Sequence, residues 1–200
     1  SAGRASLGYL TALTYGTTLS AEHGLALPAT RKLSGSGLIS TPNTLADASV
    51  LDGIVQGSGS GLVFTGYLLG DAAYTGPITF QGTLALSGSV TNLPGNTGTL
   101  TLDGAVLLAS ANATTARPLT LTSTGATFST GAGARLILDS VISGAGGLTI
   151  AGSGTTVLRG NSSYSGGTTL AGGVTEIASD SGLGLSWNSY GGVTFDGGTL

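Results

Sequence analysis

The feature that most constrains the fold is a glycine-punctuated stretch from Gly144 to Val174. Within it, short segments alternate apolar and polar residues, and glycine bounds each one: Leu148 to Ile150, Thr155 to Leu158 and Thr168 to Leu170. Period-two alternation is typical of a half-buried strand, and glycine supplies the positive φ that tight corners need. The stretch therefore predicts strand, corner, strand, corner, strand.

The same phrase occurs earlier in the chain in a weaker form. Residues 61–84 follow the pattern of residues 147–174, and residues 100–104 resemble residues 193–197. Internal similarity of this kind indicates a repeat fold, whose units stack because none can bury its apolar face alone. We therefore predict an all-β chain that forms a single β-solenoid of parallel coils, with roughly three short strands per turn.

Composition supports this fold class. Glycine provides 37 of the 200 residues, far above the average of about 7%. Glycine and β-branched residues at this density disfavour helix, so we expect little or none. The hydrophobic fraction of 40% is distributed along the chain, which argues against disorder. Glycine clusters such as Gly57 to Gly61 predict corners between strands.

The chain is predicted to be one elongated domain. Residues 1–45 are the least repetitive and are expected to form irregular first coils or a cap, whereas residues 46–200 form repeat coils. Gly197 to Leu200 stop within a repeat phrase, which predicts a piece of a longer chain. Alternation predicts these inward side chains: Leu100, Leu102, Leu119, Leu121, Phe128, Leu136, Leu138, Leu148, Ile150, Leu158, Leu170, Val193 and Phe195.

Charge and hydropathy limit the possible partners. The chain has 6 basic and 9 acidic residues and a net charge of -3, without runs of either sign. It lacks the basic stripe that phosphate binding needs, so no nucleic-acid partner is expected. The longest aliphatic run, Ala105 to Ala109, is far shorter than the roughly 20 residues of a membrane helix. We therefore expect no direct membrane insertion by this segment.

Few residues could support catalysis. His23 is the only histidine, and neighbouring Glu22 does not make a triad by itself. Lys32 is the only lysine, and no glycine-rich phosphate loop precedes it. We therefore predict no enzymatic activity, no catalytic residues and no cofactor.

The acidic residues at strand ends are candidates for catalysis, because β-helical enzymes that act on polysaccharides use carboxylates on one outer face. Asp103, Asp139 and Asp196 each follow an apolar strand segment. The simpler interpretation is a turn-forming aspartate at a corner. One acid per corner cannot supply the six to eight oxygen ligands of calcium, so no metal site is predicted.

Some polar and aromatic residues could form a binding surface. Thr99, Thr101, Thr120 and Thr122 could form an outward ladder like those of ice-binding solenoids, although a solvated strand face is the simpler interpretation. Trp187 and Tyr190 could contact a sugar or protein, or fill the core. Two asparagines could stack at corners or shape turns, namely Asn96 and Asn161.

Residues 146–174 resemble the autotransporter-associated β-strand repeat, which occurs in the passenger regions of bacterial surface autotransporters. The match rests on Gly146 to Thr149, Gly152 to Thr155, Gly160 to Tyr164 and Gly166 to Thr169. The sequence departs from the family pattern at Ala151, where lysine is common, and at residues 173–175. The resemblance implies a right-handed parallel β-helix that is exported to the bacterial cell surface.

These observations favour a structural or adhesive segment of a bacterial surface or secreted protein, with a host or cell-surface glycan or protein as a possible partner. The alternatives are a polysaccharide-acting β-helix enzyme and an ice- or glycan-binding solenoid. A solenoid end leaves strand edges open, so we also expect self-association through the C-terminal turn, from Gly191 to Leu200. On this view, Thr194→Pro would remove one donor from that edge.

Overall fold

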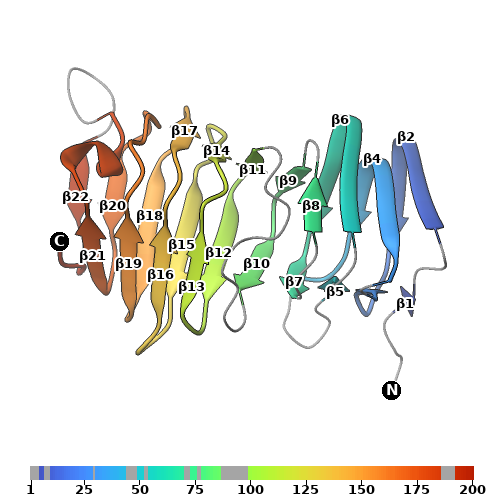
Figure 1. Ribbon diagram of the computed structural model, residues 1–200, viewed down its shortest axis with the longest axis horizontal. Helices are drawn as coiled ribbons and strands as arrows, with labels where there is room; N and C mark the ends of the chain where they lie inside the picture. The colour runs from blue at the N-terminus through green and yellow to red at the C-terminus, as the bar shows by residue number, and fades with distance from the viewer. Residues whose placement is uncertain are drawn as a thin grey trace.

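The chain folds into an elongated, all-β solenoid of parallel coils, with its two ends at opposite ends of the long axis (Figure 1). The computed structural model describes residues 5–6, 10–28, 30–43, 49–51, 54–69, 73–75, 78–86, 99–185 and 192–200. Its strand pairs are parallel, and the paired residues of neighbouring coils lie 16 to 25 positions apart in the sequence. The predicted fold class is therefore confirmed.

The strands form three sheets that follow the long axis. The first sheet has ten strands in the order β1 (Ala5–Ser6), β3 (Leu25–Leu27), β5 (Ser49–Leu51), β7 (Tyr67–Leu69), β10 (Thr83–Leu86), β12 (Ala105–Ala109), β15 (Ala126–Thr130), β18 (Leu148–Gly152), β20 (Thr168–Leu170) and β22 (Val193–Phe195). The second contains β2 (Leu10–Ser20), β4 (Lys32–Ser40), β6 (Ile54–Thr65), β9 (Ile78–Phe80), β11 (Leu100–Leu102), β14 (Leu119–Leu121) and β17 (Ile142–Gly144), with β8 (Ala73–Thr75) also paired to β6. The third contains β13 (Ala113–Thr115), β16 (Arg135–Leu138), β19 (Thr155–Leu158) and β21 (Val174–Ile177).

Among the described residues, the helical structure is limited to one short 3-10 helix, η1 (Asp180–Leu183). The strands of residues 5–43 pair with the coils that follow them, through β3 with β5 and β4 with β6. The start of the described chain is therefore continuous with the rest of the stack.

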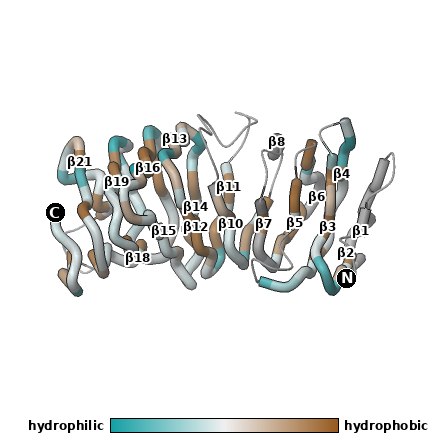
Figure 2. The backbone as a smooth tube through the Cα atoms, turned by 90° about the horizontal axis from the view of Figure 1, so that it is seen from below, coloured by the Kyte–Doolittle hydropathy of each residue, from teal (hydrophilic) through white to brown (hydrophobic). Residues whose placement is uncertain are grey.

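The core is a set of apolar columns that run along the axis, because side chains at paired positions stack from coil to coil. In the first sheet, one column joins Leu107, Phe128, Ile150 and Leu170, all almost fully buried. In the second sheet, the rings of Phe64 and Phe80 stack with centroids 5.6 Å apart. Figure 2 shows apolar segments recurring from strand to strand along the length of the molecule.

The predicted inward residues are buried, with two exceptions in the last coil. Val193 is only partly buried, and Phe195 is 60% exposed. Both pair with buried residues of β20, so they occupy inward positions in the last described coil. Burial in a solenoid depends on the next coil as well as on the direction of the side chain.

Candidate functional site: a glycine-floored trough beside a threonine column

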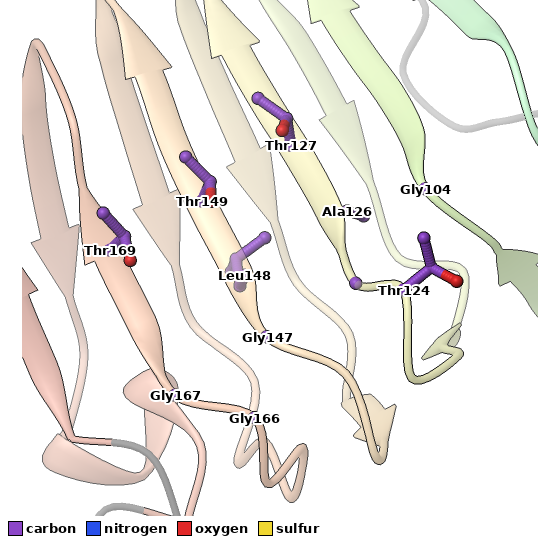
Figure 3. Close-up of a pocket in the computed structure, with 11 residues that line it drawn as sticks. Gly104, Thr124, Ala126, Thr127, Gly147, Leu148, Thr149, Gly166, Gly167 and Thr169 are labelled. Atoms are coloured by element: carbon purple, nitrogen blue, oxygen red, sulfur yellow. The ribbon is translucent and has the colours of Figure 1, made fainter.

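A trough runs along one corner of the solenoid, where strands β12, β15, β18 and β20 begin. Its cavity volume is about 210 Å³, and it is lined by Gly104, Thr124, Gly125, Ala126, Thr127, Gly147, Leu148, Thr149, Gly166, Gly167 and Thr169. Figure 3 shows the glycines at the corner and the threonines on the adjoining strands. The lining contains no charged side chain.

The glycines form the floor because adjacent coils approach closely there. The Gly104 amide donates to the Gly125 carbonyl at 2.8 Å, and the Ala126 amide donates to the Gly147 carbonyl at 3.1 Å. Gly125 has a φ of +77°, and a Cβ on it would lie 2.6 Å from the Gly147 oxygen. Glycine at this position is therefore required by the backbone, and the absence of side chains opens the trough as a consequence.

A column of threonines forms one wall. The strand register pairs Thr127 with Thr149, Thr149 with Thr169 and Thr169 with Thr194. Paired residues on neighbouring strands lie about 4.8 Å apart. Within the described chain, the hydroxyls of Thr127, Thr149 and Thr169 make no hydrogen bond to another residue. They can therefore donate to or accept from a ligand that follows the axis.

The threonines that were considered as an outward ladder lie at the second sheet, where Thr101 pairs with Thr120. The matched sequence patterns of residues 99–101 and 120–122 would instead align Thr101 with Thr122. A shift of two residues keeps every side chain on the same face, because strands alternate with a period of two. The Thr120 hydroxyl lies 3.2 Å from the Ser143 hydroxyl, so part of this ladder bonds within itself. Thr99 is exposed just before β11.

Asp103 holds neighbouring coils together at a corner. The Gln81 amide donates to its carboxylate at 2.7 Å, and the Thr122 hydroxyl donates to its other oxygen. Hydrogen bonds from Thr122, Gln81 and Thr124 hold the pKa of the Asp103 carboxyl below its usual value. A carboxylate stabilised in this way is a poor general acid at neutral pH.

The other two candidate acids also lie at corners. Asp139 accepts a hydrogen bond from Arg159 of the next coil at 3.2 Å, and both side chains are partly exposed. Asp196 is exposed directly after β22. Across the described part of the chain, no group of three or more His, Cys, Asp and Glu side chains could hold a metal ion.

The remaining candidates are scattered. His23 lies in the exposed turn between β2 and β3, and Lys32 begins β4. The Asn161 side chain accepts a hydrogen bond from the Ser181 hydroxyl at 2.9 Å, which links a corner to η1. Asn96, Trp187 and Tyr190 lie outside the described residues.

The trough is the site that sequence reasoning missed. Thr127, Thr149 and Thr169 were each visible as outward strand residues, but their alignment depends on a register that follows from unequal corner lengths. Their shared signal is the motif of a glycine followed, two residues later, by an outward threonine, as in Gly125 and Thr127 or Gly147 and Thr149.

Comparisons with known proteins give no further guide to this site. Among the described residues, no helix is long and apolar enough to cross a membrane. No protein-family model, no curated protein and no solved structure matches the chain.

Proposed function

We propose that this chain is a structural and adhesive segment of a bacterial surface or secreted protein, which extends or displays a surface outside the cell. The observation that carries the proposal is that the Asp103 and Asp139 side chains connect neighbouring coils. Each carboxylate bonds a side chain of a neighbouring coil. These acids therefore act as ties between coils, which favours a structural role over catalysis.

The solenoid is well suited to extension. Ten strands of the first sheet stack along the axis, and at a spacing of about 4.8 Å they span on the order of 45 Å. The resemblance of residues 146–174 to autotransporter passenger repeats supports export to the bacterial surface. A parallel coil also presents the same faces repeatedly, which suits contact with a glycan or protein on another cell.

The proposal is tested by incubating the purified chain with a panel of plant and bacterial polysaccharides. We expect no reducing ends above a heat-inactivated control. Turnover that is lost in Asp103→Asn or Asp139→Asn, with an unchanged circular dichroism spectrum, would establish the alternative enzyme function. Labelling of intact producing cells with an antibody against the chain tests the location, and signal only after lysis would contradict surface display.

The trough favours a second function, the binding of a neutral glycan. Its wall offers the hydroxyls of Thr127, Thr149 and Thr169, and its lining is uncharged. An extended sugar chain could exchange hydrogen bonds with such a row while its rings cover the glycine floor.

Calorimetric titration with neutral oligosaccharides tests this function. We expect Thr149→Val to weaken binding about tenfold, since it removes one hydroxyl at nearly constant volume. Thr120→Val on the second sheet is the matched control and should leave the affinity unchanged. Equal losses from the two variants would contradict binding in the trough.

A further inference from the structure

The trough crosses four coils without enclosing a space. Its lining comes from corner residues and from the first residues of β12, β15, β18 and β20, which are adjacent strands of the first sheet (Figure 3). Its volume of about 210 Å³ is below the roughly 300–1,000 Å³ of pockets that enclose a ligand. A ligand of the trough therefore lies along the solenoid axis and keeps one face in solvent.

The hydroxyls along the trough repeat once per coil. Thr127, Thr149 and Thr169 are register partners on three adjacent strands, and Figure 3 shows their side chains in the same orientation. Adjacent strands lie about 4.8 Å apart. A ligand that bonds every hydroxyl of this row must therefore be straight, and its own polar groups must repeat at close to the coil spacing.

Two threonines at the second sheet use their hydroxyls within the protein instead. The Thr120 hydroxyl lies 3.2 Å from that of Ser143, and the Thr122 hydroxyl donates to the Asp103 carboxylate. The trough threonines make no such bond to any residue that the structure describes. The row therefore keeps its hydrogen-bonding capacity for a partner outside the chain.

The row of hydroxyls begins at a defined coil. Val106 of β12 is the register partner of Thr127, so the position before Thr127 carries no hydroxyl. Thr194 of β22 continues the row on the other side. The Asp196 amide donates to the Leu170 carbonyl, and alternate residues of a parallel strand face the same neighbour, so the Thr194 amide also faces β20. The expectation that Thr194→Pro removes an edge donor is therefore wrong.

The charge beside the trough favours a neutral ligand. The lining has no charged side chain, and Asp103 directly precedes Gly104 of the lining. The hydrogen bonds to the Asp103 carboxylate lower its pKa, so it is ionised at neutral pH. A chain of uronic acids would bring further negative charge toward this carboxylate, and like charges repel.

We propose that the trough takes a neutral, β-1,4-linked polysaccharide chain, which lies along the solenoid axis with about one sugar ring per coil. This inference rests on the proposed binding of a neutral glycan, and it adds the linkage and the direction of the chain. Equatorial bonds make a β-1,4-linked glucan a straight, flat ribbon, in which each ring presents a hydroxyl at either edge. An α-1,4-linked chain of the same sugar curves, so its later hydroxyls leave the row.

Two tetrasaccharides of identical composition test the shape of the ligand, namely cellotetraose with β-1,4 links and maltotetraose with α-1,4 links. Each is titrated into the 200-residue chain and followed through backbone amide signals in NMR spectra. We expect cellotetraose to bind at least tenfold more tightly, with the largest shifts at Gly125, Gly147 and Thr149. Equal affinities would overturn this inference and leave neutral-glycan binding intact, whereas binding of neither sugar would overturn both.

The length of the row provides a second test. Thr127, Thr149, Thr169 and Thr194 supply four hydroxyls, so the affinity for β-1,4-linked glucans should rise from the disaccharide to the tetrasaccharide and then level off. Val106→Thr should lengthen the row by one coil, so that the pentasaccharide binds this variant about fivefold more tightly than the tetrasaccharide does.

Val63→Thr is the matched control for this gain, because Val63 is a partly buried, outward valine of the second sheet. A fivefold gain from the fifth sugar in the wild type or in Val63→Thr would overturn the arrangement of one ring per coil, as would no gain in Val106→Thr. Unchanged circular dichroism spectra establish that both variants are folded.

Discussion

The first coils and the later coils of this solenoid turn the same kind of corner in different ways. In the first coils, β4 and β6 pass through the corner as single long strands. Lys32 to Gly35 pair with Ile54 to Gly57, the register then shifts, and Gly37 to Ser40 pair with Leu62 to Thr65. Gly35 and Gly37, with φ values of +129° and +148°, allow this bend within a strand.

In the later coils the same corner interrupts the strand and is held by side chains. Residues 116–118 separate β13 from β14, and residues 139–141 separate β16 from β17. The Ser140 hydroxyl donates to the Arg117 carbonyl at 2.6 Å, and the Arg117 amide donates to the Thr115 hydroxyl at 3.2 Å. At the glycine corner the strand continues although its register shifts, whereas at the polar corner the strand ends and side-chain bonds connect specific coils.

The largest effect on stability is expected from truncating one buried phenylalanine in the first coils or one in the later coils. Phe64 and Phe128 are at most 1% exposed, one in the first coils and one in the later coils. Phe→Ala at either position should lower the free energy of unfolding by about 3–5 kcal/mol, measured by urea denaturation. Since coils contact mainly their neighbours, hydrogen exchange should accelerate chiefly around the altered coil. Uniform acceleration from both variants would contradict separate regional stabilities.

A smaller effect is expected from ionising Tyr164, which lies in the later coils. Tyr164 is fully buried, and its hydroxyl lies 2.6 Å from that of Thr168. Burial raises the pKa of Tyr164 to about 12, from its usual 10.0. The stability that its neutral form provides is therefore complete below pH 10 and is lost as the pH rises toward 12.

The expected loss is on the order of 1–3 kcal/mol, measured by urea denaturation at pH 9, 10 and 11. Tyr164→Phe should show a flatter dependence over this range. Parallel curves for the two proteins would contradict the assignment of this titration to Tyr164.

The two kinds of corner can be compared directly through one buried serine in each. Ser140→Ala should lower stability by about 1–2 kcal/mol, because it leaves the buried Arg117 carbonyl without that donor. Ser36→Ala, at the equally buried glycine corner of β4, should cost less than about 0.5 kcal/mol. Thermal unfolding measures both changes. Equal losses would mean that the first coils also depend on side-chain bonds at this corner.

The smallest effect concerns Asp103, which joins Gln81 of an earlier coil to Thr122 of a later one. Because its pKa is lowered in the folded chain, the stability from its carboxylate is present above the usual value of 3.8 and is lost as the pH falls through the lower folded pKa. The side chain is only partly buried, so the loss is below about 1 kcal/mol. Asp103→Asn should remove this part of the acid dependence, and an unchanged acid transition would contradict it.

Alternation and glycine punctuation predicted most of the fold, because inward side chains such as Leu148, Ile150 and Leu170 follow directly from the period of a strand. The glycines at residues 57–61 were predicted to end a strand, yet they lie within β6. Glycine permits both a corner and a bend, and the neighbouring coil decides between them. The threonine column of the trough could not be predicted for a related reason, since it depends on the register between coils.

Thr168 shows a further limit of pattern reasoning. It was not among the predicted inward residues, but it is 1% exposed. It lies in the inward column of Leu148, and its hydroxyl bonds the Tyr164 hydroxyl and the Leu183 carbonyl. Its burial depends on these partners, and hydrogen-bond partners distant in the chain leave no periodic signal.

The orientation of the strands has a mechanical consequence. They lie across the long axis of the molecule, so the hydrogen bonds between coils lie along it (Figure 1). Compression along the axis presses the coils together. Tension on the two ends instead breaks the hydrogen bonds between one pair of neighbouring coils at a time. Each released coil of roughly 20 residues adds about 65 Å of extended chain. Under load the solenoid is therefore a strut that lengthens in steps, and each step exposes a new strand edge.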